Sequence, residues 1–273
     1  MSLLGGGKSP FHDDDGSAEP RAAATLAAFG SGLGSEHAAL TALAASRLLV
    51  PIVAAPPESA GHDQHGDPGA GPARADESDH GAEMSLPTLI GRDGRPAIPA
   101  FTSLDTLARW DPRARPVATL AELVWRAAVD SSSAVVVDVA GPVPLAVEGA
   151  RLAALAGGHP VPLPHQDPDV LDAVRAAANG EPAIAGLRLI AGTDLAPEGN
   201  PDGDREPGGD REAGPGTVGS DLQVELTLAD GCAAAAGEEA ARRLGNDLMS
   251  QLGGRLRRGI TIAVTRSDRR GES

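Results

Sequence analysis

The chain has 273 residues, with 23 basic and 38 acidic side chains and a formal net charge of −15. A nucleic-acid binder needs clustered Lys and Arg, so this charge balance excludes that class. The sequence has no run of 18 apolar residues and no apolar leader after Met1, so we expect neither a membrane-spanning helix nor a secretory signal. The single cysteine, Cys232, cannot form an internal disulfide, which favours a cytoplasmic location.

The acidic charge is concentrated in three stretches that are rich in Gly, Pro, Ser and Asp. Residues 1–35, 56–82 and 191–221 carry net charges of −2, −5 and −6, and the rest of the chain carries −2. Such stretches bury too little apolar surface to offset the cost of ordering the chain, so we predict that they are disordered. The most extreme part, residues 197–216, is interpreted as a solvated linker, and an acidic tether for a basic partner is the alternative.

The first structured region, residues 36–160, alternates short helices with short strands. Ser35 is the predicted N-cap of its first helix, and Pro51 interrupts the apolar run that follows. Because proline has no N–H to give to a sheet, we expect this run to form an edge strand or a strand that starts near Pro51. Thr119 and Glu122 form a predicted capping box that opens a later helix. The other predicted strands cover 84–90, 96–101, 116–119, 134–140 and 143–147, and the other predicted helices cover 103–109 and 150–156.

Within this region lie the runs GRPAIPAFTSLDTLARWDPRARPVATLAELV and SAVVVDVAGPVPLAVEGARLAAL. Their distinctive residues are Pro99, Phe101, Thr102, Ser103 and Trp110, together with the VVVDVAGP hairpin. This combination resembles the N-terminal domain of the SseB family in its actinobacterial form, over roughly residues 40–155 with the acidic stretch 56–82 as an insertion. The resemblance implies an α/β domain with a mixed sheet, and it implies no catalytic residue.

The two aromatic residues of this motif have a structural interpretation of their own. The chain contains few bulky side chains, so Phe101 and Trp110 are needed to anchor a core. Trp110 closes a short helix from which it can fold back on Phe101. We therefore predict that the motif residues are structural, and a recognition surface is the alternative.

The second structured region, residues 161–266, shows the order α-β-β-α-β. Asp167 and Pro168 predict the start of a helix, and residues 222–228 alternate strictly between apolar and polar side chains. This order favours helices packed on one face of an antiparallel or mixed sheet, and it resembles the C-terminal domain of longer SseB family members. The remaining predicted elements are strands at 184–191 and 260–265 and a helix at 238–252.

Three arginines follow the last predicted helix, namely Arg255, Arg257 and Arg258. We expect this basic tip to keep the end of the helix in water. Contact with an acidic partner, or with the acidic stretches of this chain, is the alternative.

The fold class predicted from all elements is α+β, as two small mixed α/β domains (36–160 and 161–266) whose sheets are covered by helices. Disordered acidic Gly/Pro-rich segments separate the structured parts, with tails at 1–35 and 267–273.

Several fragments imitate functional motifs but lack the context that the chemistry needs. They lack the strand and glycine spacing of a nucleotide loop, a closed set of metal ligands, or a nucleophile beside a base. We therefore predict no catalytic residue, no cofactor and no metal. The fragments are GGGKS at residues 5–9, the glycines Gly30, Gly32 and Gly34, the pair His62 and His65, the pair His159 and His165, and Cys232.

Asp138 is the one weak candidate for a site residue. It interrupts the apolar strand VVV-D-VA, and a buried carboxylate must find hydrogen-bond donors or shift its pKa upward. Asp138 is either a site carboxylate at the end of a strand or a residue that faces solvent or binds the backbone near Gly141.

From these observations we expect a non-enzymatic, cytoplasmic protein-interaction module that binds a protein partner, with no nucleic acid and no membrane. One alternative is a small-ligand binder or enzyme with an interdomain site that uses Asp138 or the interdomain histidines. Another alternative is a secretion-related accessory protein, which only other uses of the family's name suggest.

Overall fold

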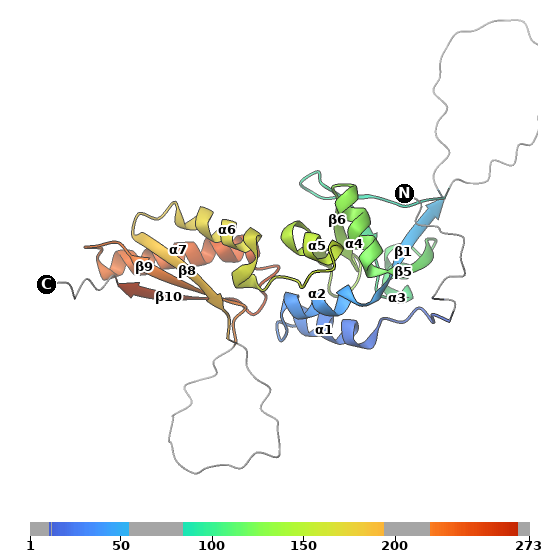
Figure 1. Ribbon diagram of the computed structural model, residues 1–273, viewed down its shortest axis with the longest axis horizontal. Coiled ribbons are helices and arrows are strands. Elements are labelled where there is room, and N and C mark those ends of the chain that lie inside the picture. Colours follow the sequence, from blue (N-terminus) through green and yellow to red (C-terminus); the bar gives the residue numbers. More distant parts are fainter. Residues whose placement is uncertain (1–10, 12, 55–83, 194–218, 267–273) are drawn as a thin grey trace, which may run out of the picture.

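The computed structural model describes Phe11 and residues 13–54, 84–193 and 219–266. Two α+β units follow one another along the chain (Figure 1), which confirms the predicted fold class. The predicted insertion 56–82, most of 191–221 and the tail 267–273 lie outside the described residues. Among the residues that the structure describes, no helix is both long and apolar enough to cross a membrane.

The N-terminal unit contains two small sheets, with strand orders β2-β1-β5 and β3-β4-β6-β7. Strands β4 and β6 are parallel and the other neighbours are antiparallel, and a bridge between Leu49 and Phe101 joins the two sheets. The elements are α1 (Pro20–Gly30), α2 (Glu36–Ala44), β1 (Arg47–Ala54), β2 (Met84–Ser85), β3 (Leu89–Ile90), β4 (Pro96–Ala100), α3 (Leu104–Trp110), β5 (Arg115–Leu120), α4 (Ala121–Asp130), β6 (Ala134–Val137), β7 (Leu145–Val147) and α5 (Gly149–Ala156).

The prediction that residues 1–35 form a disordered tail is wrong for the part that the structure describes. Helix α1 begins at Pro20, and the Glu19 carboxylate caps it by accepting hydrogen bonds from the first backbone N–H groups. Its apolar face buries Leu26 and Phe29 in the main core. The acidic residues that suggested disorder precede this helix. Averaging the charge over residues 1–35 therefore did not distinguish them from the apolar segment that forms α1.

The expected edge position of the strand around Pro51 is also wrong, because β1 is the middle strand of its sheet. Pro51 lies opposite Pro116 in the antiparallel register with β5. Neither proline has an N–H, so this pair occupies a non-hydrogen-bonded position, where no ladder bond is lost. A proline pair is therefore compatible with an interior strand.

Two further local predictions need correction. Helix α4 begins at Ala121 without a side-chain cap, because Thr119 belongs to β5, where it lies opposite Leu48. Glu122 pairs instead with Arg126 one turn further along the helix. The strand expected over residues 84–90 is two short strands, β2 and β3, separated around Pro87. Ser35, by contrast, caps α2 as predicted, since its hydroxyl accepts from the backbone N–H of Ala38.

The N-terminal unit has two apolar clusters. The larger cluster lies between the helices and both sheets, and its largest member is the fully buried Trp125 of α4. The smaller cluster contains Leu49, Phe101 and Leu107, with Trp110 packed against it. The motif aromatics thus form a small core of their own beside the main one.

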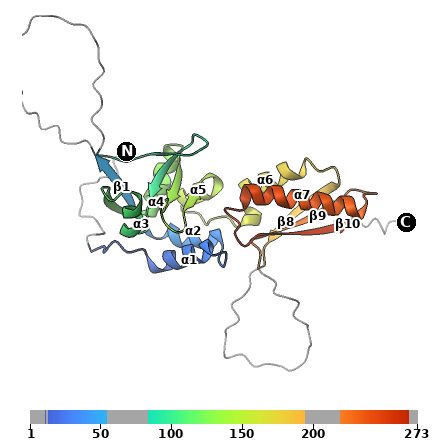
Figure 2. The same ribbon diagram turned by 180° about the vertical axis from the view of Figure 1, so that it is seen from behind.

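The C-terminal unit contains the 3-10 turn η1 (Pro164–Gln166), α6 (Pro168–Ala178), β8 (Ile184–Ala191), β9 (Leu222–Leu228), α7 (Ala234–Leu252) and β10 (Ile260–Arg266). The predicted α-β-β-α-β order is confirmed, in a mixed sheet of order β10-β9-β8. Figure 2 shows α7 running across the strands, where Leu222, Val224 and Leu226 meet the helices.

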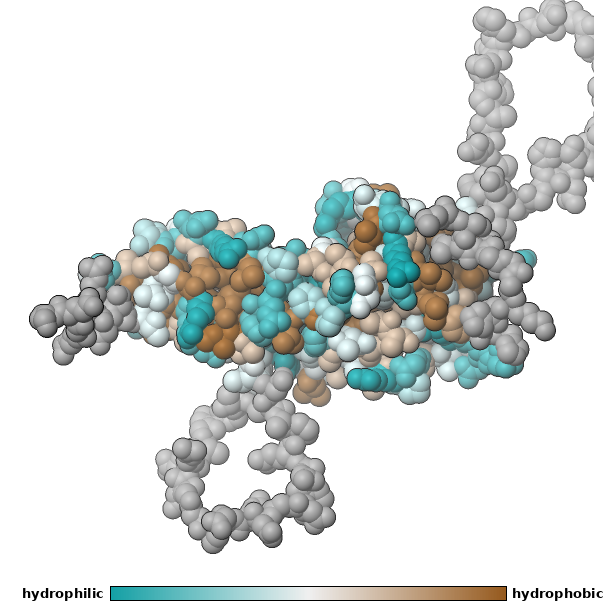
Figure 3. Space-filling model, viewed as in Figure 1, coloured by the Kyte–Doolittle hydropathy of each residue, from teal (hydrophilic) through white to brown (hydrophobic). Residues whose placement is uncertain are grey.

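No helix of the described residues packs on the other face of this sheet. The side chains of this face include Gln223 and Glu225 of β9, and Glu225 forms an exposed ion pair with Arg188 of β8. The half-buried Ile190 of β8 lies opposite Gln223 on this face, and Figure 3 shows apolar residues at the surface of this unit. The C-terminal sheet is therefore covered on one face only.

Candidate functional site

The motif residues lie where β4 ends and α3 begins. Pro99 is in β4, opposite Val136 of the parallel strand β6. Ser103 caps α3 in a capping box with Thr106. Trp110 at the end of α3 folds back on the fully buried Phe101, with ring centroids 5.5 Å apart, as predicted. The motif therefore builds a strand-to-helix turn with an aromatic pair beneath it.

Asp138 holds this turn in place. It follows β6 and is buried, so the solvent-facing alternative for this residue is wrong. One carboxylate oxygen accepts the backbone N–H of Thr102 at 2.9 Å, and the other accepts the Thr102 hydroxyl at 2.6 Å. Its backbone has a positive φ of 50°, a conformation that Asp tolerates better than most residues. Both carboxylate oxygens are thus bound to the motif.

Arg47, the first residue of β1, continues this chain of hydrogen bonds. Its Nη1 donates to the carbonyl of Thr102 at 2.7 Å, and its Nη2 donates to the Oδ1 of Asp14 at 2.6 Å, while Nε binds the other carboxylate oxygen. The Arg47 guanidinium holds the pKa of Asp14 below its ordinary value. We call Asp14, Arg47, Thr102 and Asp138 the motif network.

The segment around Asp14 lies against the start of α3. The carbonyl of Gly16 accepts the backbone N–H of Leu104 at 2.8 Å, so this segment satisfies a free donor at the start of the helix. Gly16 has a φ of 78°, and a Cβ there would collide with the side chain of Leu104. We call Phe11 and residues 13–17 the N-terminal strap.

A pocket of about 370 Å³ lies between the N-terminal strap, α3 and β5. Its lining is largely apolar, and we call it the motif groove. Leu104 at its edge is 41% exposed, and Leu49 and Ala118 in its wall also contact the small aromatic core. The motif aromatics therefore lie behind the groove and support it. The lining residues are Phe11, Asp14, Gly16, Leu49, Leu104, Pro116, Val117 and Ala118.

Residues 22–154 match the family described as SseB protein N-terminal domain. The chain contains an SseB protein N-terminal domain. The matched segment begins in α1 and ends in α5, so the SseB domain includes Arg47, Thr102 and Asp138 but not the N-terminal strap. No curated protein and no solved structure matches the chain. The likeness of the C-terminal unit to longer SseB family members stays a prediction, as does the actinobacterial form.

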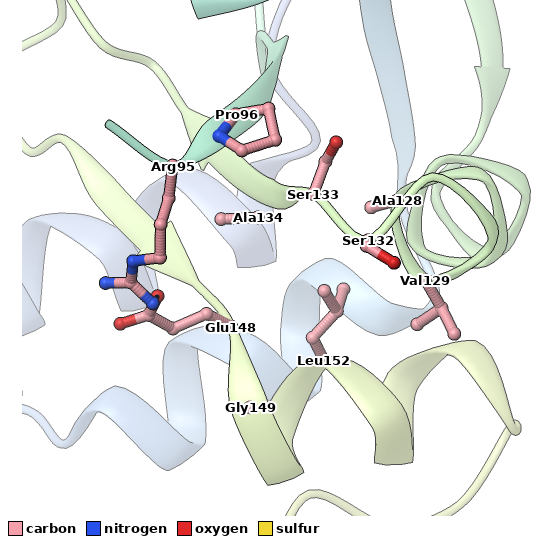
Figure 4. Close-up of a pocket in the computed structure, with 10 residues that line it drawn as sticks. All are labelled: Arg95, Pro96, Ala128, Val129, Ser132, Ser133, Ala134, Glu148, Gly149 and Leu152. Atoms are coloured by element: carbon pink, nitrogen blue, oxygen red, sulfur yellow. Dashed lines mark ion pairs between the residues drawn. The ribbon is translucent and has the colours of Figure 1, made fainter. Parts of the chain in front are cut away.

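A second pocket of the SseB domain, of about 250 Å³, lies where β4 and β6 start and α4 ends (Figure 4). Arg95 and Glu148 pair across 2.6 Å at one side, and Ser132 and Ser133 lie at the other. Among the residues that the structure describes, the one carboxylate in its lining is paired with Arg95 and no histidine lines it. The pocket therefore offers its serines no evident general base.

A second buried group of charges joins the SseB domain to the C-terminal unit. Arg255, just after α7, binds Asp167 at the start of α6 and Glu36 at the start of α2. Arg151 of α5 binds the other oxygen of Glu36. We call Glu36, Arg151, Asp167 and Arg255 the junction network. Asp169 of α6 also accepts the first free N–H of α5, from Ala150, at 2.9 Å.

The arginines of the predicted basic tip contact protein groups as well as water. The Arg257 guanidinium lies 4.4 Å from the centroid of the Phe29 ring, and its Nη1 donates to the carbonyl of Gly30 at 3.2 Å. Arg258 binds Asp221 in its own unit at 2.8 Å. These arginines bind acidic, aromatic and carbonyl groups of this chain, although Arg257 itself stays exposed.

Burial decides the electrostatics of the junction network. It raises the pKa of Glu36 and lowers that of Arg151, because both side chains are almost completely removed from water. Burial also opposes the charge of Arg255, but the nearby Glu36 and Asp167 outweigh that effect and raise its pKa. The network therefore keeps its charges at a desolvation cost.

The other candidate residues do not assemble into a site. Asp138 is bound to Thr102, and no hydrogen bond of the described residues joins it to His159 or His165. The Sγ of Cys232 is 3.5 Å from the carbonyl of its neighbour Ala233. The described part of the chain contains no group of His, Cys, Asp and Glu that could hold a metal ion. Residues 5–9, His62 and His65 lie outside it, and the 30–34 glycines join two helices.

Sequence reasoning missed Asp14, Arg47, Glu36 and Arg151. The run DDDGS at residues 13–17 is a local signal for an Asx turn, and its hydrogen bonds from Gly16 and Ser17 to preceding Asp side chains are of this kind. The other contacts join residues far apart in the chain, so no local pattern announces them.

Proposed function

We propose that this chain is a non-enzymatic protein-interaction module and that the motif groove binds a segment of its partner. The observation behind this proposal is that the groove already contacts a piece of polypeptide. Phe11 and Asp14 of the strap line the groove, and Arg47 of the SseB domain binds Asp14. A surface that binds a strap of its own chain through side chains and a carbonyl has the chemistry to bind a similar segment of another protein.

The polar groups around the groove support a binding role over catalysis. Asp138 is fully engaged by Thr102, and Asp14 is engaged by Arg47. Both carboxylates therefore serve to shape the groove, and neither is poised to exchange a proton with a substrate. The single cysteine supports a cytoplasmic site of action, which we include in the proposal.

A photocrosslinking experiment tests the proposal. Pro116, an exposed residue of the groove, is replaced by benzoylphenylalanine in the full chain inside cells that make it. We expect a discrete protein adduct that is lost when Val117→Asp places a charge in the apolar wall. The matched control carries the same photoreactive residue at Thr261, an exposed position of β10. Equal adducts from both positions, or none from position 116, would contradict the proposal.

A small-ligand binder remains the second candidate, and the pocket shown in Figure 4 favours it. Its Arg95–Glu148 pair and two serines could bind a small polar molecule above the apolar side chains of Val129 and Leu152. A thermal-shift screen of metabolites distinguishes this candidate. A ligand of the pocket raises the melting temperature of the wild type but not that of Arg95→Ala.

A further inference from the structure

We infer that the N-terminal strap forms one side of the motif groove in the place of a partner segment, and that this place selects partner segments with an aromatic side chain followed three residues later by a carboxylate. The inference rests on the proposed function and specifies its ligand. The strap displays this pattern itself in Phe11 and Asp14.

The strap makes three kinds of contact that a partner segment can copy. Phe11 lines the motif groove together with the apolar residues Leu49 and Val117. The carboxylate of Asp14 meets the guanidinium of Arg47, and the carbonyl of Gly16 meets the N–H of Leu104. Each contact uses a feature that any polypeptide with the same spacing can present.

Arg47 makes the carboxylate a requirement. Its side chain is only 11% exposed, and the carbonyl of Thr102 fixes the direction of its guanidinium from the SseB domain side. Under a segment that covers it in this way, the guanidinium is costly without a counter-charge. Two parallel N–H···O bonds also favour a planar carboxylate over a neutral side chain. The groove therefore needs an acidic residue at this position, from the strap or from a partner.

The strap is suited to exchange because its attachment is local. It lies outside the matched SseB domain, before residue 22, and the N-cap of α1 at Glu19 is separate from it. Releasing it exposes the groove without opening the main core. While it is bound, a partner must compete with a tethered segment, whose effective concentration is on the order of millimolar for a short flexible tether. The strap thus lowers the apparent affinity for partners.

Gly16 gives a way to release the strap without substituting a residue of the groove walls on β1 and β5. Valine at this position suffers from the positive φ and collides with Leu104, so Gly16→Val should lift the strap. Gly94→Val is the matched control, because Gly94 has a similar φ of 80° but open space around it. Both variants carry the same backbone strain, and only the first disturbs the strap.

The probe is a fluorescent peptide with the sequence of residues 9–18, SPFHDDDGSA, titrated against the full chain and followed by anisotropy. We expect the Gly16→Val chain to bind it at least about tenfold more tightly than the wild type or the Gly94→Val chain, because the tethered competitor is gone. Peptides with Phe11→Ala or with Asp14→Asn should lose this binding. Because the residues change in the peptide, the folding of the protein is not affected.

The inference is overturned if the released chain binds the probe no better than the control chain, or if the Asp14→Asn peptide binds equally well. A concentration-dependent dimer of the Gly16→Val chain that excludes the probe also overturns it and assigns the groove to a second copy. If the probe fails while the position-116 crosslink persists, the proposed function stands and this selectivity is wrong. If both fail, the groove is not an interaction surface.

Discussion

Two arginine–carboxylate networks hold this molecule together, and they do so at different electrostatic cost. In the motif network, Arg47 links the N-terminal strap to the strand-to-helix turn of the SseB domain. In the junction network, Arg255 links the SseB domain to the C-terminal unit. Both connect segments that are distant in sequence.

The difference lies in how each carboxylate is solvated. In the motif network, Arg47 lowers the pKa of Asp14 and so favours its charged form. In the junction network, burial raises the pKa of Glu36 and so disfavours its charged form. Buried ion pairs often contribute little net stability but penalise incorrect arrangements. The comparison suggests that the motif network stabilises the domain, whereas the junction network sets how the two units dock.

The largest expected effect is in the motif network. Asp138→Ala leaves the N–H and hydroxyl of Thr102 without acceptors and places alanine at a positive φ. We expect it to lower the free energy of unfolding by about 3 kcal/mol, measured by urea denaturation. Asp138→Asn keeps the shape and one acceptor, so it should lose less. A loss under about 1 kcal/mol for the alanine variant would contradict a structural role for Asp138.

A double-mutant cycle tests the junction network. Glu36→Gln and Arg151→Met each leave a buried partner without its counterpart, so each should cost about 2–3 kcal/mol in urea denaturation. The double variant should cost less than the sum, by at least about 1 kcal/mol. The exposed pair Glu122 and Arg126 is the control, with a coupling below about 0.5 kcal/mol. Additive losses at Glu36 and Arg151 would show that the two residues do not act together.

A smaller effect is expected where Arg257 covers the ring of Phe29. Arg257→Ala removes the cation–π contact and should lower the free energy of unfolding by about 1 kcal/mol. Arg242→Ala removes an exposed arginine of α7 and should change it by less than about 0.5 kcal/mol. Equal melting temperatures for the two variants would mean that Arg257 does not hold the units together.

The subtlest expected effect is a difference in pH dependence. The pKa of Glu36 is raised on folding, so its contribution to stability is fully present below about pH 4.3 and decreases as the pH rises toward the folded pKa. The pKa of Asp14 is lowered, so its contribution is present above about pH 3.9 and is lost on further acidification. As the pH rises, the stability of the wild type relative to Glu36→Gln should therefore decrease. The stability of the wild type relative to Asp14→Asn should increase over the same change. Slopes of the same sign would contradict the comparison.

The sequence predicted the elements that local periodicity determines. Strand β9 has the predicted bounds, because strict alternation over seven residues defines a strand with one covered face. Strand β8 also has the predicted bounds, as a run of mostly apolar residues. The motif residues were correctly placed at a strand-to-helix turn, since Ser103 and the Asp111–Pro112 pair mark both ends of α3.

The sequence did not predict the roles of residues whose contacts come from segments distant in the chain. Thr119 has the local pattern of a cap, but its pairing opposite Leu48 places it in a strand. Asp138 finds its partner 36 residues away, and Arg255 finds Glu36 at a separation of 219 residues. Neither contact leaves a pattern in a short window, so the roles of these charged residues emerged only from the fold.

The separation of Glu36 and Arg255 also has a consequence for biosynthesis. A ribosome that adds about 5–20 residues per second needs roughly 10–40 seconds to reach Arg255 after it has passed Glu36. During this interval Arg151, which is made much earlier, can supply the counter-charge that Glu36 needs. The SseB domain can therefore complete its own charge pairing on the ribosome, and Arg255 later adds a second partner to a carboxylate that is already neutralised.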